Sequence, residues 1–286
     1  MHRVCRRIGQ IAAVFAGFLC VPATFAAEDC SSPSDDCVAV GRWNFSIALG
    51  AGIRTNPLVH GRDIPLIVVP QFSWYGKRFF IDNLDPGVTL FEGDVNTISL
   101  IASPGYDRVF FYRSDLQNIF IGGAAGSTYA VQPPPRETPQ IKQPLPQSPR
   151  KVTYLAGPEW TFKYADLTGQ LDYLHEITGR NHGDEIRAAV GMPLGYLEGA
   201  WSANLGVTWK SAAIVNYYYG SPGVYRPGPA LNPFARIGYS RPLSTKWKLD
   251  AFVHCERLGG AIADSPIVAR RYVTTGFIGA TYVFHK

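Results

Sequence analysis

The chain has 286 residues and a formal net charge of +5, with 13% aromatic and 17% charged residues, 29 glycines and 22 prolines. Few charges and many turn formers favour strands separated by turns. Three of the 27 basic residues and none of the 22 acidic ones lie in residues 1–26, so the rest has 24 basic residues against 22 acidic, a net charge of +2. This argues against nucleic-acid binding, which normally leaves a clustered basic patch.

Residues 1–26 have the three parts of a secretory signal peptide. Arg3, Arg6 and Arg7 are the basic start, residues 11–21 are apolar, and Ala26 ends a stretch suited to cleavage. The apolar run is shorter than the roughly 20 residues that span a bilayer as a helix, and Pro22 closes it. We predict a cleaved signal peptide; a retained membrane anchor is the alternative.

Export would place the cysteines that follow the signal peptide in an oxidising compartment, which permits disulfides. Bulky Phe18 and Leu19 before Cys20 argue against lipid attachment at that cysteine. Cys30 and Cys37 lie in residues 27–42, a predicted periplasmic segment where they could form a small disulfide loop. The sequence leaves their pairing open, and no nearby His or Cys favours a metal there. Cys255 is interpreted as a small apolar residue on a strand.

Residues 198–210 alternate over a length that would cross a membrane as a strand. One face is small or polar: Glu198, Ala200, Ser202, Asn204, Gly206, Thr208 and Lys210. The other is apolar with tryptophans near its ends: Trp201, Ala203, Leu205, Val207 and Trp209. These faces suit an enclosed lumen and lipid, respectively. Residues 166–177 repeat the scheme, although Leu174 breaks it and His175 lies on the wrong face. A soluble sandwich also alternates, so alternation alone does not decide.

The whole chain contains twelve such segments, which predicts an all-β transmembrane antiparallel barrel of about twelve strands over residues 43–284. An even number is typical of bacterial barrels. The predicted strands are residues 43–53, 64–75, 78–91, 95–105, 118–130, 152–163, 166–177, 184–192, 198–210, 230–240, 246–257 and 272–284. Asp85, Pro86 and Gly87 interrupt the third strand, where we expect a bend or bulge.

The lengths of the connections distinguish the two ends of the predicted barrel. With a periplasmic start, the periplasmic connections are mostly tight turns, and the outer connections, such as residues 54–63, 211–229 and 258–271, are mostly long. Residues 106–117 are then the longest periplasmic connection within the barrel. The outer connection at residues 131–151 contains seven prolines, which favour an extended, solvated loop. It is either an exposed binding loop or a tolerated insertion.

Several blocks of sequence together resemble the MipA/OmpV family, in order from residue 43 to residue 284. They are WNFSIALGAG at 43–52 with RTNP at 54–57, VPQFSWYGKRFF at 69–80, YYYG at 217–220 with Tyr225, ADSPIV at 263–268 after Arg257 and Leu258, and GATYVF at 279–284. The last block also has the pattern of a terminal outer-membrane strand, although His285 and Lys286 follow Phe284.

The resemblance implies a protein of the bacterial outer membrane. For the founding member it implies a scaffold that links a lytic murein transglycosylase to a murein synthase, so the expected partners are periplasmic murein hydrolases and synthases. Residues 28–42 and 106–117 are the predicted contact surfaces. A small-solute pore or channel is the alternative function. No block is a catalytic motif, and the resemblance implies no cofactor.

The sequence contains no recognisable catalytic, cofactor-binding or metal-binding motif, and an enzyme is not expected. Ser265, His175 or His254, and Asp172 or Asp250 could be drawn as a Ser-His-acid set, but no nucleophile elbow supports it. The histidines at 60, 182 and 285 lack the spacing of metal ligands. The glycine-rich residues 122–126 lack the Lys-Ser/Thr ending of a phosphate loop.

Charged residues on the predicted lumen face are of both signs, and charges cannot readily face lipid. They are Glu159, Lys163, Asp172, Glu176, Glu185, Arg187, Glu198 and Lys210. Mixed signs predict ion pairs and a packed interior, whereas a lining of one sign would favour selective transport.

Overall fold

The computed structural model describes residues 41–112, 150–195 and 199–284. The predictions for the signal peptide, for Cys30 and Cys37, for a strand at 118–130, for residues 122–126 and for most of the Pro-rich segment lie outside these residues. Within them, none of the helices is long and apolar enough to cross a membrane.

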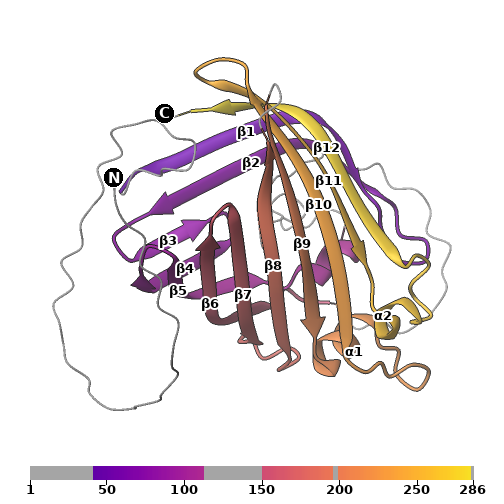
Figure 1. Cartoon of the computed structure of the whole chain (residues 1–286). Helices are drawn as coiled ribbons and strands as arrows, with labels where there is room; N and C mark the ends of the chain where they lie inside the picture. The colour runs from indigo at the N-terminus through magenta and orange to yellow at the C-terminus, as the bar shows by residue number, and fades with distance from the viewer. Residues whose placement is uncertain (1–40, 113–149, 196–198, 285–286) are drawn as a thin grey trace, which may run out of the picture. The chain divides into compact units, whose positions relative to one another are not determined.

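The described strands form a closed antiparallel barrel in which each strand pairs with its sequence neighbours and β12 pairs with β1 (Figure 1). The strands are β1 (Trp43–Arg54), β2 (Ile64–Tyr75), β3 (Phe79–Asp82), β4 (Asp85–Glu92), β5 (Asn96–Pro104), β6 (Tyr154–Tyr164), β7 (Leu167–Glu176), β8 (Asp184–Gly195), β9 (Ala200–Lys210), β10 (Ala230–Pro242), β11 (Trp247–Arg257) and β12 (Tyr272–Val283). Closure matters because it leaves no unpaired edge. The predicted fold class and strand number are confirmed.

The prediction of one continuous strand over residues 78–91 is wrong. This stretch is a hairpin of β3 and β4 that turns at Asn83 and Leu84. Asn83 has a φ of 54°, a left-handed conformation that asparagine tolerates better than most residues. Its side-chain Oδ1 accepts a hydrogen bond from the Phe72 amide at 3.2 Å, which anchors the turn to β2. The extra strand reverses the direction of β5 relative to the prediction.

The side chains of the strands alternate between the two faces of the wall. In β9, Leu205 is 60% exposed on the outside, whereas Lys210 on the opposite face is 7% exposed. The outer face carries a large share of the exposed apolar side chains, among them Leu49, Leu100, Leu171, Val190, Leu205, Ile237, Val253 and Ile278. Aromatic residues such as Trp43, Tyr164, Trp201 and Trp247 are exposed where strands begin or end. An apolar band flanked by aromatics suits the hydrocarbon layer and its interfaces.

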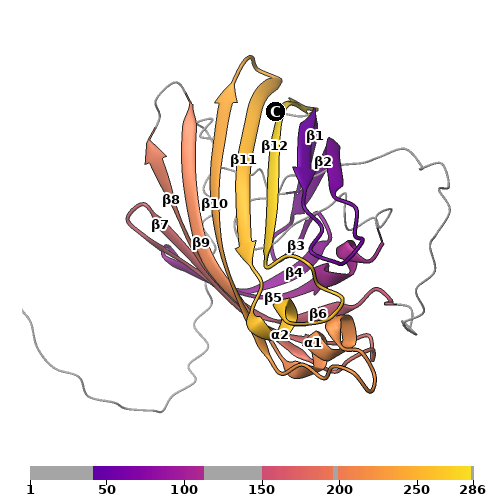
Figure 2. The same ribbon diagram turned by 90° about the vertical axis from the view of Figure 1, so that its right-hand side faces the viewer.

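The two ends of the barrel differ in their connections. Residues 76–78, 93–95, 165–166 and 243–246 make tight turns at one end, here called the tight-turn end, where β1 begins and β12 ends. The opposite end, the loop end, carries α1 (Ala212–Tyr219) and α2 (Gly260–Ala263), which lie side by side beneath the strands (Figures 1 and 2). In such barrels short turns face the periplasm.

An apolar cluster packs at the loop end. Ile214, Val215 and Tyr218 of α1 and Ile262 of α2 pack with Leu174 of β7, and all five are nearly or fully buried. Leu174 therefore faces inward against residues of α1 and α2, and this apolar packing explains why it breaks the polar pattern of β7. His175 lies on the outer face, where its Nδ1 is 2.9 Å from Asp184 Oδ1.

Candidate functional site

The connection that follows β5 turns into the lumen at the loop end. Tyr106–Phe110 form a short 3-10 helix, and Asp107 is 3% exposed. Asp107 Oδ2 lies 2.5 Å from Lys210 Nζ, and its Oδ1 accepts a hydrogen bond of 2.8 Å from the Tyr219 hydroxyl. Burial, with the charge of Asp107 as a further cause, raises the pKa of Tyr219 well above its ordinary value, so the hydroxyl remains a donor.

This placement corrects the prediction that residues 106–117 are a periplasmic contact surface. Their described part, residues 106–112, lies at the loop end, because the β3–β4 hairpin adds a strand before β5. Asn56 Nδ2, in the β1–β2 connection, donates a hydrogen bond of 2.8 Å to the Phe110 carbonyl. Together with Asp107, this contact fastens the segment to the barrel on two sides.

A chain of ion pairs continues from Asp107 along the lumen wall. Lys210 Nζ is also 4.0 Å from Glu185 Oε2, and Glu185 Oε1 accepts a hydrogen bond of 2.7 Å from Arg187 Nε. Arg187 Nη1 in turn donates to Ser103 Oγ on β5 at 2.9 Å. The predicted pairing of lumen charges is confirmed for Glu185, Arg187 and Lys210. Sequence reasoning missed Asp107, because it gave this residue to a turn at the other end.

The other charged residues predicted to face the lumen take no part in this chain of ion pairs. Gln170 Nε2 bridges Glu159 and Asp172 at 2.9 and 3.1 Å. Glu176 ends β7 and accepts backbone hydrogen bonds from residues 178 and 180–182. Lys163 is exposed beside a tight turn. Glu198 lies outside the described residues.

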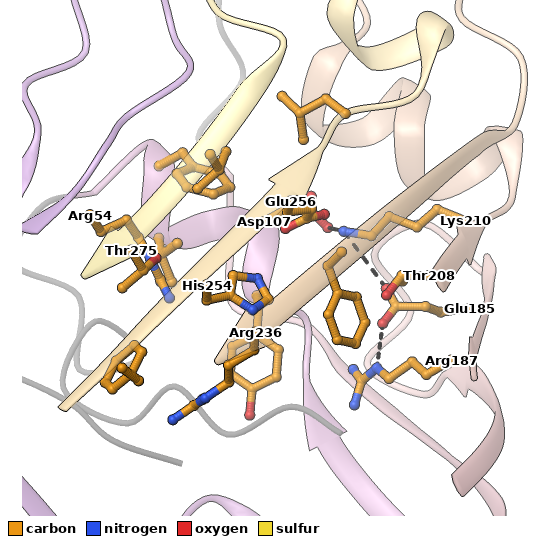
Figure 3. Close-up of a pocket in the computed structure, with 17 residues that line it drawn as sticks. Arg54, Asp107, Glu185, Arg187, Thr208, Lys210, Arg236, His254, Glu256 and Thr275 are labelled. Atoms are coloured by element: carbon orange, nitrogen blue, oxygen red, sulfur yellow. Dashed lines mark hydrogen bonds and ion pairs between the residues drawn. The ribbon is translucent and has the colours of Figure 1, made fainter. Parts of the chain in front are cut away.

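Between the ion pairs and the opposite wall lies a cavity of about 150 Å³, the lumen pocket (Figure 3). Its polar lining comprises Arg54, Tyr106, Asp107, Glu185, Arg187, Thr208, Lys210, Arg236, His254, Glu256 and Thr275. Its apolar lining comprises Val109, Phe110, Phe234, Phe252, Leu258 and Val273. These residues come from β1, β8, β9, β10, β11, β12, the 3-10 helix and, for Leu258, the connection after β11, so the pocket depends on closure of the barrel.

The structure does not bring the possible catalytic residues together. Ser265 Oγ donates a hydrogen bond of 2.6 Å to the Tyr219 carbonyl, which makes it a structural contact of the loop end. His254 lies in the lumen pocket, with its ring 5.3 Å from that of Phe234, while His175 is on the outer face. Asp250 accepts a hydrogen bond from Ser240 at 2.7 Å.

The residues considered for metal binding are also separated. His60 and His182 lie in different loops of the loop end, and His285 is outside the described residues. No group of three or more His, Cys, Asp or Glu side chains within the described ranges is arranged to hold a metal ion. Cys255 is a free thiol on β11, paired in register with Thr274.

A closed twelve-stranded barrel with an apolar outer band and a charged interior defines a β-barrel protein of the bacterial outer membrane. A comparison with known protein families identifies the family to which this barrel belongs. The family model of MltA-interacting protein MipA matches residues 47–284, and the chain belongs to this family. The family resemblance and the outer-membrane location expected from the sequence are thus confirmed.

Curated relatives agree with the family assignment. The MltA-interacting protein of Escherichia coli K12 is 23% identical over 261 residues, covering 86% of this chain and 93% of the relative, and that of Shigella flexneri matches to the same extent. Among solved structures, a KdgM porin aligns with 84% of this chain and 99% of its own, at 10% identity and a TM-score of 0.37. That TM-score is too low for the likeness to bear on function.

Proposed function

We propose that this protein is a non-enzymatic scaffold of the outer membrane that binds murein-remodelling enzymes at its periplasmic face. Its relatives carry the name MltA-interacting protein. An enzyme of the MltA type, a murein hydrolase, would reach the barrel from the periplasm. A murein synthase would be a second partner.

The observation that carries the proposal is the fastening of residues 106–112 inside the mouth of the barrel. Asp107 pairs with Lys210, and Asn56 bonds to the Phe110 carbonyl. The helices α1 and α2 pack at the same end of the barrel. Such an interior is better suited to a rigid platform than to free passage of solutes. The small-solute pore expected as the alternative has no comparable feature in its favour among the described residues.

The tight-turn end offers the surface on which a partner would dock. Its described exposed charges are six basic residues and three acidic ones: Arg42, Lys77, Arg78, Lys163, Arg241 and Lys246 against Glu92, Asp94 and Asp166. A basic excess favours encounter with an acidic patch on the partner and makes the association sensitive to salt. This surface replaces residues 106–117 as the proposed contact within the barrel.

The test is co-purification of an MltA-type transglycosylase with the full-length protein from cross-linked cell envelopes. We expect the triple variant Lys77→Gln, Arg241→Gln and Lys246→Gln to lower recovery several-fold, and more strongly at low salt. The matched control removes three exposed arginines at the loop end, Arg62, Arg180 and Arg226, and should leave recovery unchanged. Equal recovery with both triple variants would reject the tight-turn end as the docking surface.

A further inference from the structure

The outer face of β11 and β12 changes from apolar to cationic as it approaches the loop end. Because short turns face the periplasm, the loop end meets the outer leaflet of the membrane. We propose that this face binds a lipid of that leaflet, a glycolipid with a phosphorylated sugar headgroup, and that Arg257 binds its phosphate. The proposal goes beyond the scaffold function and does not depend on it.

The order of side chains along these two strands follows the parts of a membrane lipid. β11 and β12 lie side by side in the barrel wall (Figure 2). On their outer face, exposed Val253 belongs to the apolar band. Cys255 and Thr274 come next as a pair in register, and Arg257 and Tyr272 form the pair at the loop end. Apolar, then polar, then cationic and aromatic side chains match acyl chain, linkage and headgroup, respectively.

Arg257 offers a free cation on this outer face. It is exposed and forms no ion pair with any residue that the structure describes. Its neighbour Glu256 points to the lumen, where its Oε1 accepts a hydrogen bond of 2.7 Å from Asn232 Nδ2. His175, on the outer face of β7, is by contrast engaged by Asp184 at 2.9 Å. The planar guanidinium of Arg257 is therefore available, and its geometry matches that of a phosphate.

The two connections next to this face, residues 54–63 and 258–271, add to the positive charge. Their charged residues that are not buried are three arginines and two aspartates: Arg62, Arg270, Arg271, Asp63 and Asp264. Arg270 Nη1 is 2.8 Å from Asp63 Oδ1, and Arg271 Nη2 is 2.5 Å from Asp264 Oδ1. These two pairs cancel in charge, so Arg62 and Arg257 remain as a surplus of positive charge. Such a surplus at the level of the headgroups attracts anionic lipids.

Gly276 leaves room for an acyl chain on the same face. A side chain at this position of β12 would meet only the Phe252 carbonyl oxygen, at 4.0 Å. Its register partners, Ile53 on β1 and Val253 on β11, are 50% and 57% exposed, so they stand on either side of the open space. An acyl chain over Gly276 would contact both side chains and bury apolar surface. A free phosphate ion would leave this space unused, which favours a lipid as the ligand.

The first experiment is native mass spectrometry of the full-length protein, released from neutral detergent micelles after addition of diphosphoryl lipid A. Lipid A without phosphates is the comparison lipid, and inorganic phosphate is the competitor. We expect diphosphoryl lipid A to be retained and the dephosphorylated lipid to bind about tenfold more weakly, because it lacks the charge that Arg257 would bind. Inorganic phosphate at about 10 mM should not displace the lipid. No retention, equal retention of both lipids, or displacement by phosphate would overturn the proposal.

The second experiment locates the site by substitution. Arg257→Gln should weaken retention of diphosphoryl lipid A about tenfold, while Arg257→Lys keeps the charge and should weaken it less. Gly276→Leu fills the open space and should also weaken retention, although it changes no charge. The matched control is Arg180→Gln, which removes an exposed arginine of the loop end between β7 and β8 and should leave retention unchanged.

A heat-dependent gel shift verifies that each variant is folded. Unchanged retention in both Arg257→Gln and Gly276→Leu would place the lipid elsewhere and contradict the proposal. Should one of these variants fail to fold, the other variant and the comparison of lipids on the unaltered protein still decide. Recovery of an MltA-type transglycosylase is a separate measurement, so failure of the lipid site and failure of the scaffold role are distinguishable.

Discussion

At the scale of single residues, the structure depends on charges buried inside the lumen. Lys210 is 7% exposed and compensates Asp107 at 2.5 Å and Glu185 at 4.0 Å. A buried ion pair contributes less to stability than its Coulomb energy suggests, but removal of one partner leaves a charge without compensation. Lys210 matters because, through Asp107, it holds residues 106–112 against the barrel wall.

Lys210→Met tests this connection. The variant leaves Asp107 and Glu185 buried near one another without their shared cation, and we expect it to lower the free energy of unfolding by about 3–5 kcal/mol. The midpoint of urea unfolding in micelles, followed by tryptophan fluorescence, measures the loss. The double variant Asp107→Asn with Lys210→Met should recover part of it, and Lys163→Met, at an exposed lysine, should change little. An unaltered midpoint for Lys210→Met would show that the pair does not hold the segment.

At the scale of elements, strand alternation was readable from sequence, but the path of β3 and β4 was not. The two faces of β9 are as predicted, because a strand between water and lipid must separate polar from apolar side chains. The β3–β4 hairpin is shorter than a membrane span and turns at Asn83. Asp85, Pro86 and Gly87 marked the region for a bend or bulge, but no long polar loop indicated a full reversal of the chain. Because the prediction treated this hairpin as one strand, it gave β5 the opposite direction and placed Asp107 at the wrong end of the barrel.

The faces of β9 can be tested with a pair of arginines. Leu205→Arg places a charge on the outer apolar band and should cost about 2–4 kcal/mol if it lies near the middle of the bilayer. Ser202 faces inward on the same strand. Ser202→Arg should lower the free energy of unfolding by less, because the lumen already accommodates charged side chains. Unfolding of both variants in lipid vesicles gives the comparison. A larger loss for Ser202→Arg would mean that the faces of β9 are assigned the wrong way round.

The hairpin itself depends on the left-handed backbone of Asn83. Asn83→Val should lower the free energy of unfolding by about 2 kcal/mol or more, because a β-branched residue resists this conformation and the side-chain hydrogen bond from the Phe72 amide is lost. Asn83→Gly keeps the backbone freedom and loses only the side-chain contact, so its loss should be smaller. Urea midpoints for the two variants measure the difference. Equal losses would indicate that the turn does not constrain the backbone.

At the scale of the whole molecule, the parts that the sequence predicts best are those set by the membrane: the strand number, the outer face and the different lengths of connections at the two ends. The lumen pocket could not be predicted, since its residues come from six strands, the 3-10 helix and the connection after β11, and meet only when the barrel closes. His254 and Arg236 each belong to an alternating strand, and nothing in either strand alone indicates a shared cavity.

In the proposed role the barrel binds its partners at the tight-turn end and does not conduct solutes through an open lumen. The most direct test is to reconstitute the full-length protein into planar lipid bilayers and to record the current under an applied voltage, with a heat-dependent gel shift as proof of folding. We expect no steady conductance above the bare membrane, and channel steps only once Lys210→Met or Asp107→Asn loosens residues 106–112 at the loop end. Stable, stepwise conductance from the unaltered protein would contradict it.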